Sequence, residues 1–103
     1  VSLEIDCAKI PLLPGIAEMA DMGLIPAGSY ENKKYIGAKV VNYSPMGRFA
    51  EDIAFDPQTS GGLLLAIPPR EAEEVAAILR ENGFAETALI GRFIKGEEKL
   101  ILK

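Results

Sequence analysis

The first residues of the chain alternate between apolar and polar side chains. Over Val1 to Asp6 (VSLEID), the apolar residues Val1, Leu3 and Ile5 recur at every second position. Side chains at that spacing share one face of an extended strand. We therefore predict a half-buried strand at the start of the chain.

A second apolar segment has no alternation with polar residues. It covers Gly62 to Ile67 (GLLLAI) and is closed by Pro68-Pro69. A strand without polar alternation is typical of strands that are covered on both faces. This run predicts a short strand, buried on both faces and central in its sheet.

Helical spacing is clearest over Arg70 to Asn82. The apolar residues that fall at i, i+3, i+4 and i+7, and so share one helix face, are Ala72, Val75, Ala76 and Leu79. Glutamates fill the first turn, where the helix dipole favours negative charge. Gly83 follows and can adopt the left-handed conformation that ends many helices. The pattern predicts the longest helix of the chain here.

Three shorter helices are expected earlier in the chain. One covers Pro14 to Gly23, with Pro14 at the first helical position and Gly23 beyond the end. A second covers Ser29 to Tyr35, with Ser29 as its N-cap and Gly37 as its stop. The third covers Arg48 to Phe55, where apolar residues gather on one side.

The remaining extended segments complete a sheet. They are Ala38 to Tyr43, Ala88 to Ile94 and Lys99 to Lys103, and a turn around Gly96-Glu97 joins the last two as a closing hairpin. Ala38 to Tyr43 can alternatively be irregular extended chain. Mixed strands and helices predict an α+β fold, with a mixed sheet of about four strands and helices packed on one face. A length of 103 residues predicts a single domain, residues 1–103.

The net negative charge argues against two classes of binding partner, nucleic acid and anionic membranes. The formal net charge is -4, and Lys33-Lys34 is the only adjacent pair of basic residues. Binding to nucleic acid or to an anionic membrane surface requires clustered cations. The longest apolar run, Leu63 to Pro69, is far shorter than the roughly 20 residues that span a bilayer. We expect neither nucleic acid nor membrane as a partner.

The chain lacks the residues that several kinds of catalysis require. The chain has no histidine and one cysteine, Cys7. This excludes Ser-His-Asp and Cys-His catalysis and makes a zinc site untenable. A nucleophilic Cys7 would need a neighbouring base or a helix N-terminus, so a plain buried cysteine is the favoured interpretation. Asp52 and Asp56 are possible paired carboxylates, but nothing in the sequence places them together. We expect no catalytic residue and no metal ligand.

The loop DPQTSGG is the one unusual element, and it supports two interpretations. Its glycines can let the backbone enter a crowded central strand as a tight turn. Alternatively, the consecutive N–H groups of Ser60, Gly61 and Gly62 can form an anion-binding nest that faces a ligand or a neighbouring domain. The candidate site residues are Asp56, Gln58, Thr59, Ser60, Gly61 and Gly62. The loop matches neither a P-loop nor GxGxxG, because no lysine or helix follows it.

Two long segments resemble one family. DPQTSGGLLLAIPP (Asp56 to Pro69) is similar to the C-terminal domain of selenophosphate synthetase (selenide, water dikinase). IPLLPGIAEMADMGLIPAGSYENKKYIG (Ile10 to Gly37) is similar to that family's segment in the same relative place, where a Leu-Pro-Gly helix leads to a turn and a second short helix. The resemblance implies the C-terminal fold of the aminoimidazole ribonucleotide (AIR) synthetase-like superfamily.

The resemblance also implies a function for a longer enzyme. Members use ATP, selenide and water to make selenophosphate. The resemblance implies a homodimeric enzyme of the cytoplasm. ATP and Mg²⁺ are held mainly by the N-terminal domain, which also supplies the catalytic cysteine or selenocysteine. Cys7 does not match that residue. The chain begins with Val1 rather than methionine. We expect a C-terminal fragment of a two-domain enzyme that is inactive alone and holds no cofactor.

Two alternatives remain open at this point. The chain can instead belong to a sister ATP-dependent enzyme of the same superfamily, although the intact DPQTSGG loop argues against this. It can also be a stand-alone module that binds a small ligand or a protein and has borrowed the fold. The sequence upstream of Val1 separates these possibilities.

Overall fold

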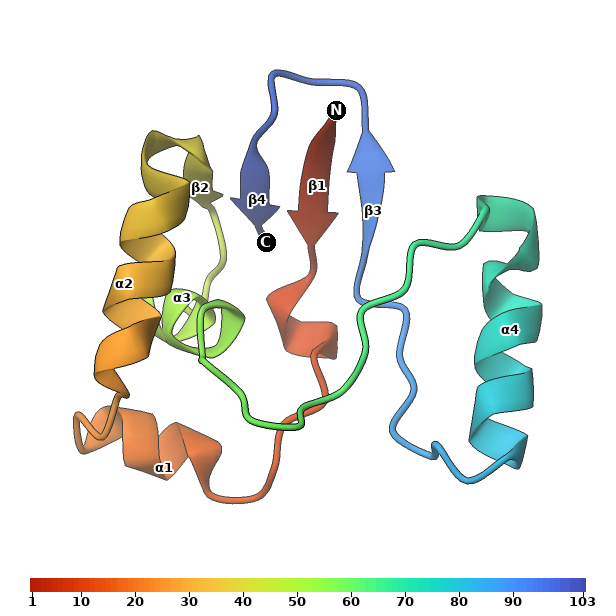
Figure 1. The fold of residues 1–103 in the computed structure, drawn as a ribbon, viewed down its shortest axis with the longest axis horizontal. Helices are drawn as coiled ribbons and strands as arrows, with labels where there is room; N and C mark the ends of the chain where they lie inside the picture. Colours follow the sequence, from red (N-terminus) through yellow and green to blue (C-terminus); the bar gives the residue numbers. More distant parts are fainter.

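The computed structural model describes all residues, Val1–Lys103, and shows a central sheet flanked by helices (Figure 1). The strands are β1 (Ser2–Ile5), β2 (Val40–Asn42), β3 (Gly91–Ile94) and β4 (Leu100–Leu102). The α-helices are α1 (Ile16–Asp21), α2 (Ala27–Ile36), α3 (Arg48–Ala54) and α4 (Pro69–Glu81). Short 3-10 turns cover Cys7–Lys9 and Gly37–Lys39. The predicted α+β class is confirmed, and none of these helices has the length and apolar character of a membrane span.

The four-stranded sheet is mixed and has the order β2-β4-β1-β3. β1 pairs antiparallel with β3 and parallel with β4, which in turn pairs parallel with β2. The predicted hairpin between the last two strands is wrong, because β1 lies between β3 and β4. The connection instead crosses the start of β1, where the Lys99 N–H donates to the Ser2 hydroxyl at 3.1 Å. A tight hairpin turn would have required adjacent strands.

The predicted central strand at Gly62 to Ile67 is also wrong. These residues have no regular secondary structure, and Leu63 is 89% exposed. No backbone group of residues 56–67 is hydrogen-bonded to another backbone group. An apolar run indicates a tendency to be buried, but it does not determine which strand, if any, the segment pairs with. The inner positions of this sheet are taken by β1 and β4.

The core is small and lies where α3 meets the sheet. Its buried residues are Cys7, Ala50 of α3 and Leu102 of β4. Half-buried apolar residues pack around them: Ile5, Val40, Met46, Ile53, Ala54 and Leu100. Because α3 contributes to this core, its position relative to the sheet is fixed by packing.

The helix boundaries follow local signals, with two exceptions. α1 begins at Ile16, because Gly15 before it adopts a left-handed backbone with φ at 86°, so the prediction that Pro14 occupies the first helical position is wrong. α4 occupies nearly the predicted residues, and Gly83 adopts the left-handed backbone expected beyond its end, with φ at 97°. α2, however, begins at Ala27 after Pro26, so the prediction that Ser29 is an N-cap is wrong. Pro26 ends the preceding extended segment, which lets the helix start earlier. Ser29 instead lies within the first turns and is buried.

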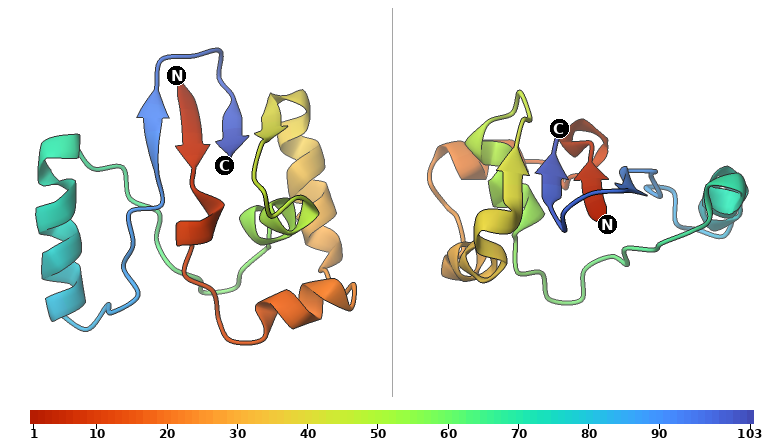
Figure 2. Two further views of the ribbon diagram at one scale, coloured as in Figure 1. Left: turned by 180° about the vertical axis from the view of Figure 1, so that it is seen from behind. Right: turned by 90° about the horizontal axis from the view of Figure 1, so that it is seen from above.

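The helices divide into two groups in space. α2 and α3 lie together on the β2 side of the sheet, whereas α4 stands beyond β3 (Figure 2). The chain between these groups is the segment that contains DPQTSGG. The loop of interest therefore leaves the end of α3 and crosses toward α4.

Candidate functional site

The DPQTSGG loop begins two residues after the end of α3 and is exposed over its whole length. Ser60 has a left-handed backbone with φ at 54°, a conformation that is uncommon outside glycine. The Gln58 side chain folds over Gly61 and fills the space that a Cβ would take there, whereas Gly62 faces open space. The N–H groups of Ser60, Gly61 and Gly62 have no backbone partner, which leaves them free to donate.

The base of the loop is attached to α2 by two contacts. Asn32 donates a hydrogen bond from Nδ2 to the Phe55 carbonyl oxygen at 2.9 Å. The Pro57 ring packs against Gly28, where a Cβ would lie 2.9 Å from Pro57 Cγ. Only glycine permits this approach without displacement of the loop. The two sequence segments that carry the family resemblance thus meet in space.

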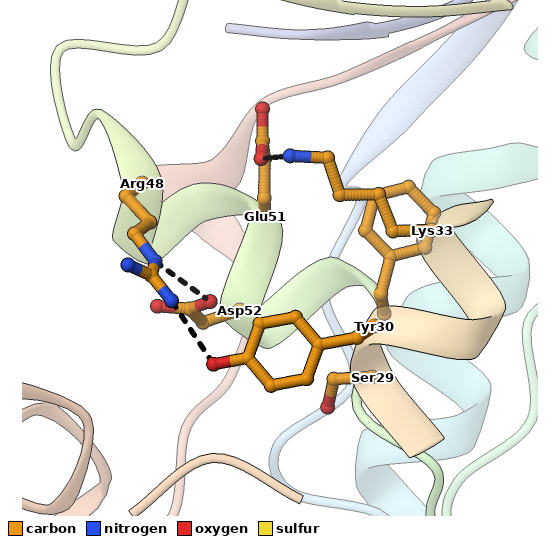
Figure 3. A pocket seen from close by; sticks show the side chains of 7 residues that line it. Ser29, Tyr30, Lys33, Arg48, Glu51 and Asp52 are labelled. Atoms are coloured by element: carbon orange, nitrogen blue, oxygen red, sulfur yellow. Dashed lines mark hydrogen bonds and ion pairs between the residues drawn. The ribbon is translucent and has the colours of Figure 1, made fainter. Parts of the chain in front are cut away.

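A pocket of about 290 Å³ opens beside this attachment, between α2 and α3. We call it the α2–α3 pocket. Its polar lining residues are Ser29, Tyr30, Lys33, Arg48, Glu51 and Asp52 (Figure 3). Figure 3 shows the first three rising from α2 and the others from α3, so that the charged side chains face one another across the opening. Phe55 closes the pocket on the loop side.

Glu51 links three elements at one side of this pocket. Its carboxylate pairs with Lys33 of α2 and accepts a hydrogen bond from Asn42 Nδ2 of β2 at 3.2 Å. Burial alone would raise the pKa of Glu51. The hydrogen bonds from Lys33 and Asn42, with the charges of Lys33 and Arg48, outweigh burial and lower that pKa. Glu51 is therefore ionised at neutral pH and holds α2, α3 and β2 together.

Arg48 lies at the opposite side, over the Tyr30 ring. Its Nη2 donates to the Tyr30 hydroxyl at 3.0 Å, and its guanidinium carbon lies 6.0 Å from the ring centroid. Its Nε lies 3.8 Å from Asp52 Oδ1, which is too long for a hydrogen bond. The Arg48 side chain is 71% exposed and that of Asp52 only 14%. The cation is thus at the mouth and the carboxylate inside.

The other candidate residues do not form a catalytic cluster. Cys7 is buried as predicted, and burial raises the pKa of its thiol, which opposes the reactive thiolate. Asp52 and Asp56 line different pockets, since Asp56 borders a second hollow beside Asn32. No group of three or more His, Cys, Asp or Glu residues is arranged to hold a metal ion.

Sequence reasoning missed the α2–α3 pocket. Ser29 was expected to be a helix cap, and the basic pair Lys33-Lys34 reads as a solvated helix face. The opposite charges of Lys33 and Glu51 are the one signal in the sequence, but they stand 18 positions apart. Nothing in a local pattern indicates that two helices so separated will face each other.

Comparisons with known proteins agree with the resemblance that DPQTSGG and the preceding segment indicate. Over 101 residues, the chain is 41% identical to a selenide, water dikinase of Clostridioides difficile (strain 630), covering 98% of this chain and 29% of that protein. A selenide, water dikinase 2 of Peptoclostridium acidaminophilum is 40% identical, with 99% of this chain and 29% of the relative covered. The corresponding enzyme of Pelobacter propionicus is 42% identical, with 90% and 27% covered.

The chain therefore spans less than a third of the length of these relatives. A family model for the C-terminal domain of AIR synthase related proteins matches it from residue 1 to residue 103. A match over the whole chain establishes membership. The chain belongs to the family of AIR synthase related proteins, C-terminal domain.

Proposed function

We propose that residues 1–103 form the C-terminal domain of a longer, two-domain selenide, water dikinase, which makes selenophosphate from ATP, selenide and water. Identity of about 40% to enzymes of that name, along nearly the whole chain, supports the assignment. The observation that carries it is the junction of α2 with the loop. The Gly28–Pro57 and Asn32–Phe55 contacts hold the base of DPQTSGG and leave its glycine end open.

The requirements of phosphoryl transfer indicate which domain of the complete enzyme holds ATP and the metal ion. Phosphoryl transfer depends on positioning and on charge neutralisation, usually by metal ions held on carboxylates. The residues here do not suit Mg²⁺, because no cluster of three or more possible ligands exists. In our proposal the preceding N-terminal domain holds ATP and Mg²⁺, and the complete enzyme is a cytoplasmic homodimer. The DPQTSGG loop forms one wall of the site, where the N–H groups of Ser60 to Gly62 face an anionic group.

Complementation tests the assignment. In a strain that lacks selenophosphate synthesis, the complete protein should restore selenium incorporation, and the 103-residue chain expressed alone should not. Failure of the complete protein would contradict the proposed activity. Rescue by the chain alone would contradict the placement of the chemistry in another domain.

The role of the loop is tested by Gly61→Val in the complete protein. The valine meets the Gln58 side chain, including its Cβ at 2.8 Å, so the exposed loop must shift locally, away from the core, and the free N–H groups are covered. Activity should fall by about tenfold or more, as expected when a hydrogen bond to a charged group is lost. Ala77→Val, at an exposed position of α4, is the matched control and should retain activity. Equal losses of stability and activity in Gly61→Val would indicate that the loop serves the fold and not a ligand.

A further inference from the structure

The α2–α3 pocket contains a buried hydroxyl without a hydrogen bond. Ser29 is 4% exposed, and its Oγ has no partner. A serine in a helix usually bonds a carbonyl one turn earlier or faces water, and this one does neither. An unsatisfied buried polar group is destabilising, so most such groups have partners. The Ser29 hydroxyl is thus an unpartnered group in the wall of the pocket, which a ligand reaches once a neighbouring side chain moves aside.

Asp52, on the facing helix, is also short of partners. Its carboxylate is largely buried, and its nearest cation is Arg48, whose Nε stands 3.8 Å away. An ionised carboxylate offers about four acceptor positions, and none of them is filled by a hydrogen bond here. α2 and α3 therefore present two unfilled acceptors to the same cavity.

The mouth of the pocket has the opposite character. Arg48 carries five N–H donors by its chemistry, and its one hydrogen bond goes to Tyr30. Its side chain is mostly exposed. The remaining donors are free to meet an anionic group that enters from solvent. The pocket thus has acceptors inside and a guanidinium at its rim.

The charges select the kind of ligand. The charged lining residues are Lys33 and Arg48 against Glu51 and Asp52, which sum to zero. A simple anion would be repelled by the inner carboxylates, and a simple cation by the guanidinium at the mouth. A dipolar molecule with its positive end inside meets neither penalty. The volume of about 290 Å³ lies near the lower limit for ligand pockets and so suits a small molecule.

We propose that the α2–α3 pocket binds a small zwitterion of the amino-acid type. The ammonium group donates to Asp52 and to the Ser29 hydroxyl, and the carboxylate accepts from Arg48. This site is separate from the DPQTSGG loop and does not depend on the activity proposed above.

Three probes of matched size test the proposal by isothermal titration calorimetry on the complete protein. Glycine carries both charges, acetate lacks the ammonium group and methylamine lacks the carboxylate. We expect millimolar binding of glycine and at least tenfold weaker binding of the other two, because each loses a charged hydrogen bond. Absence of glycine binding, or equal binding of all three probes, would overturn the proposal.

Variants locate the site. Asp52→Asn should weaken glycine binding by roughly tenfold or more, whereas Asp21→Asn, at an exposed position of α1, should not change it. Ser29→Ala should weaken binding while leaving thermal stability equal or higher, because it removes an unsatisfied hydroxyl. Undiminished glycine binding in Asp52→Asn would contradict the proposal. So would a loss of stability in Ser29→Ala, since it would show that the hydroxyl serves the fold.

Discussion

The helices on the two sides of the sheet form a contrast. α4 has the stronger helical sequence, with a clear apolar face and acidic residues at its start, yet Ala76 is its only buried residue and Ile78 is 50% exposed. α2 contains Gly28 and Asn32, which are weak helix formers. It is nevertheless joined to the rest of the molecule at several points. Local signals are enough to form a helix, but contacts between distant segments determine where it lies.

The DPQTSGG loop connects the α2–α3 side of the sheet with the α4 side. Its base is held by Asn32 and Gly28 of α2, and beyond Pro57 it has no backbone hydrogen bond. A loop that is fixed at one end and free at the other suits a binding wall, since its position is defined while its N–H groups remain available.

The largest effect should come from the core beneath α3. Leu102 is fully buried, so Leu102→Ala should cost about 2–5 kcal/mol in the free energy of unfolding of the 103-residue chain. Leu64, of the same type, is 68% exposed, and Leu64→Ala should change it by less than about 0.5 kcal/mol. Urea unfolding measures both. Equal losses would mean that the run near the loop is packed after all.

The next effect concerns the close approach of α2 and the loop. Gly28→Val places a branched side chain where Pro57 lies, so we expect a loss of about 1–3 kcal/mol from overpacking. Gly62→Ala, which meets open space, should change the free energy of unfolding by less than about 0.5 kcal/mol. Thermal unfolding compares the two variants. A tolerated valine at residue 28 would argue against the contact.

A smaller loss should follow removal of the Asn32 side chain. Asn32→Ala deletes the hydrogen bond to the Phe55 carbonyl and should cost about 1 kcal/mol. Lys34→Ala on the same helix removes an exposed side chain that makes no hydrogen bond or ion pair, and it serves as the control. Urea unfolding gives the difference between them, and identical midpoints would show that the hydrogen bond does not hold the loop.

The smallest effect is electrostatic. The pKa of Glu51 is lowered, so the stability that its carboxylate contributes is present above its ordinary value of 4.5 and is lost as the pH falls through the lowered pKa. Glu51→Gln should therefore be less stable than the parent at neutral pH, and the difference should shrink in acid. Unfolding in urea at a series of pH values measures it. A difference that is constant with pH would indicate lost packing instead of lost charge.

The sequence predicts what depends on neighbours along the chain. α3, α4 and β1 follow from spacing, and Gly37 marks the end of α2 because its left-handed backbone is a local requirement. Strand partners depend on distant residues. The crossing of β1 by the last connection, and the open state of Gly62 to Ile67, could not be inferred from periodicity alone.

The candidate site divides in the same way. The composition of DPQTSGG predicts a loop, because proline, serine and glycine favour turns, but it leaves open whether the N–H groups of Ser60 to Gly62 are free. The α2–α3 pocket depends on helices that are separated in sequence, and its key residue Ser29 resembles an ordinary helix cap until the structure places it inside. The pocket depends on the pairing of α2 with α3, which no local pattern in the sequence indicates.

Amide hydrogen exchange tests the central claim most directly. The 103-residue chain would be placed in deuterated buffer and the exchange rate of each amide followed. We expect protected amides in α2 and α3, and rates close to those of an unstructured peptide from Gln58 to Ile67. Slow exchange across Gly62 to Ile67 would show that these amides are paired in a sheet, and it would contradict a loop that is held at its base and free beyond it.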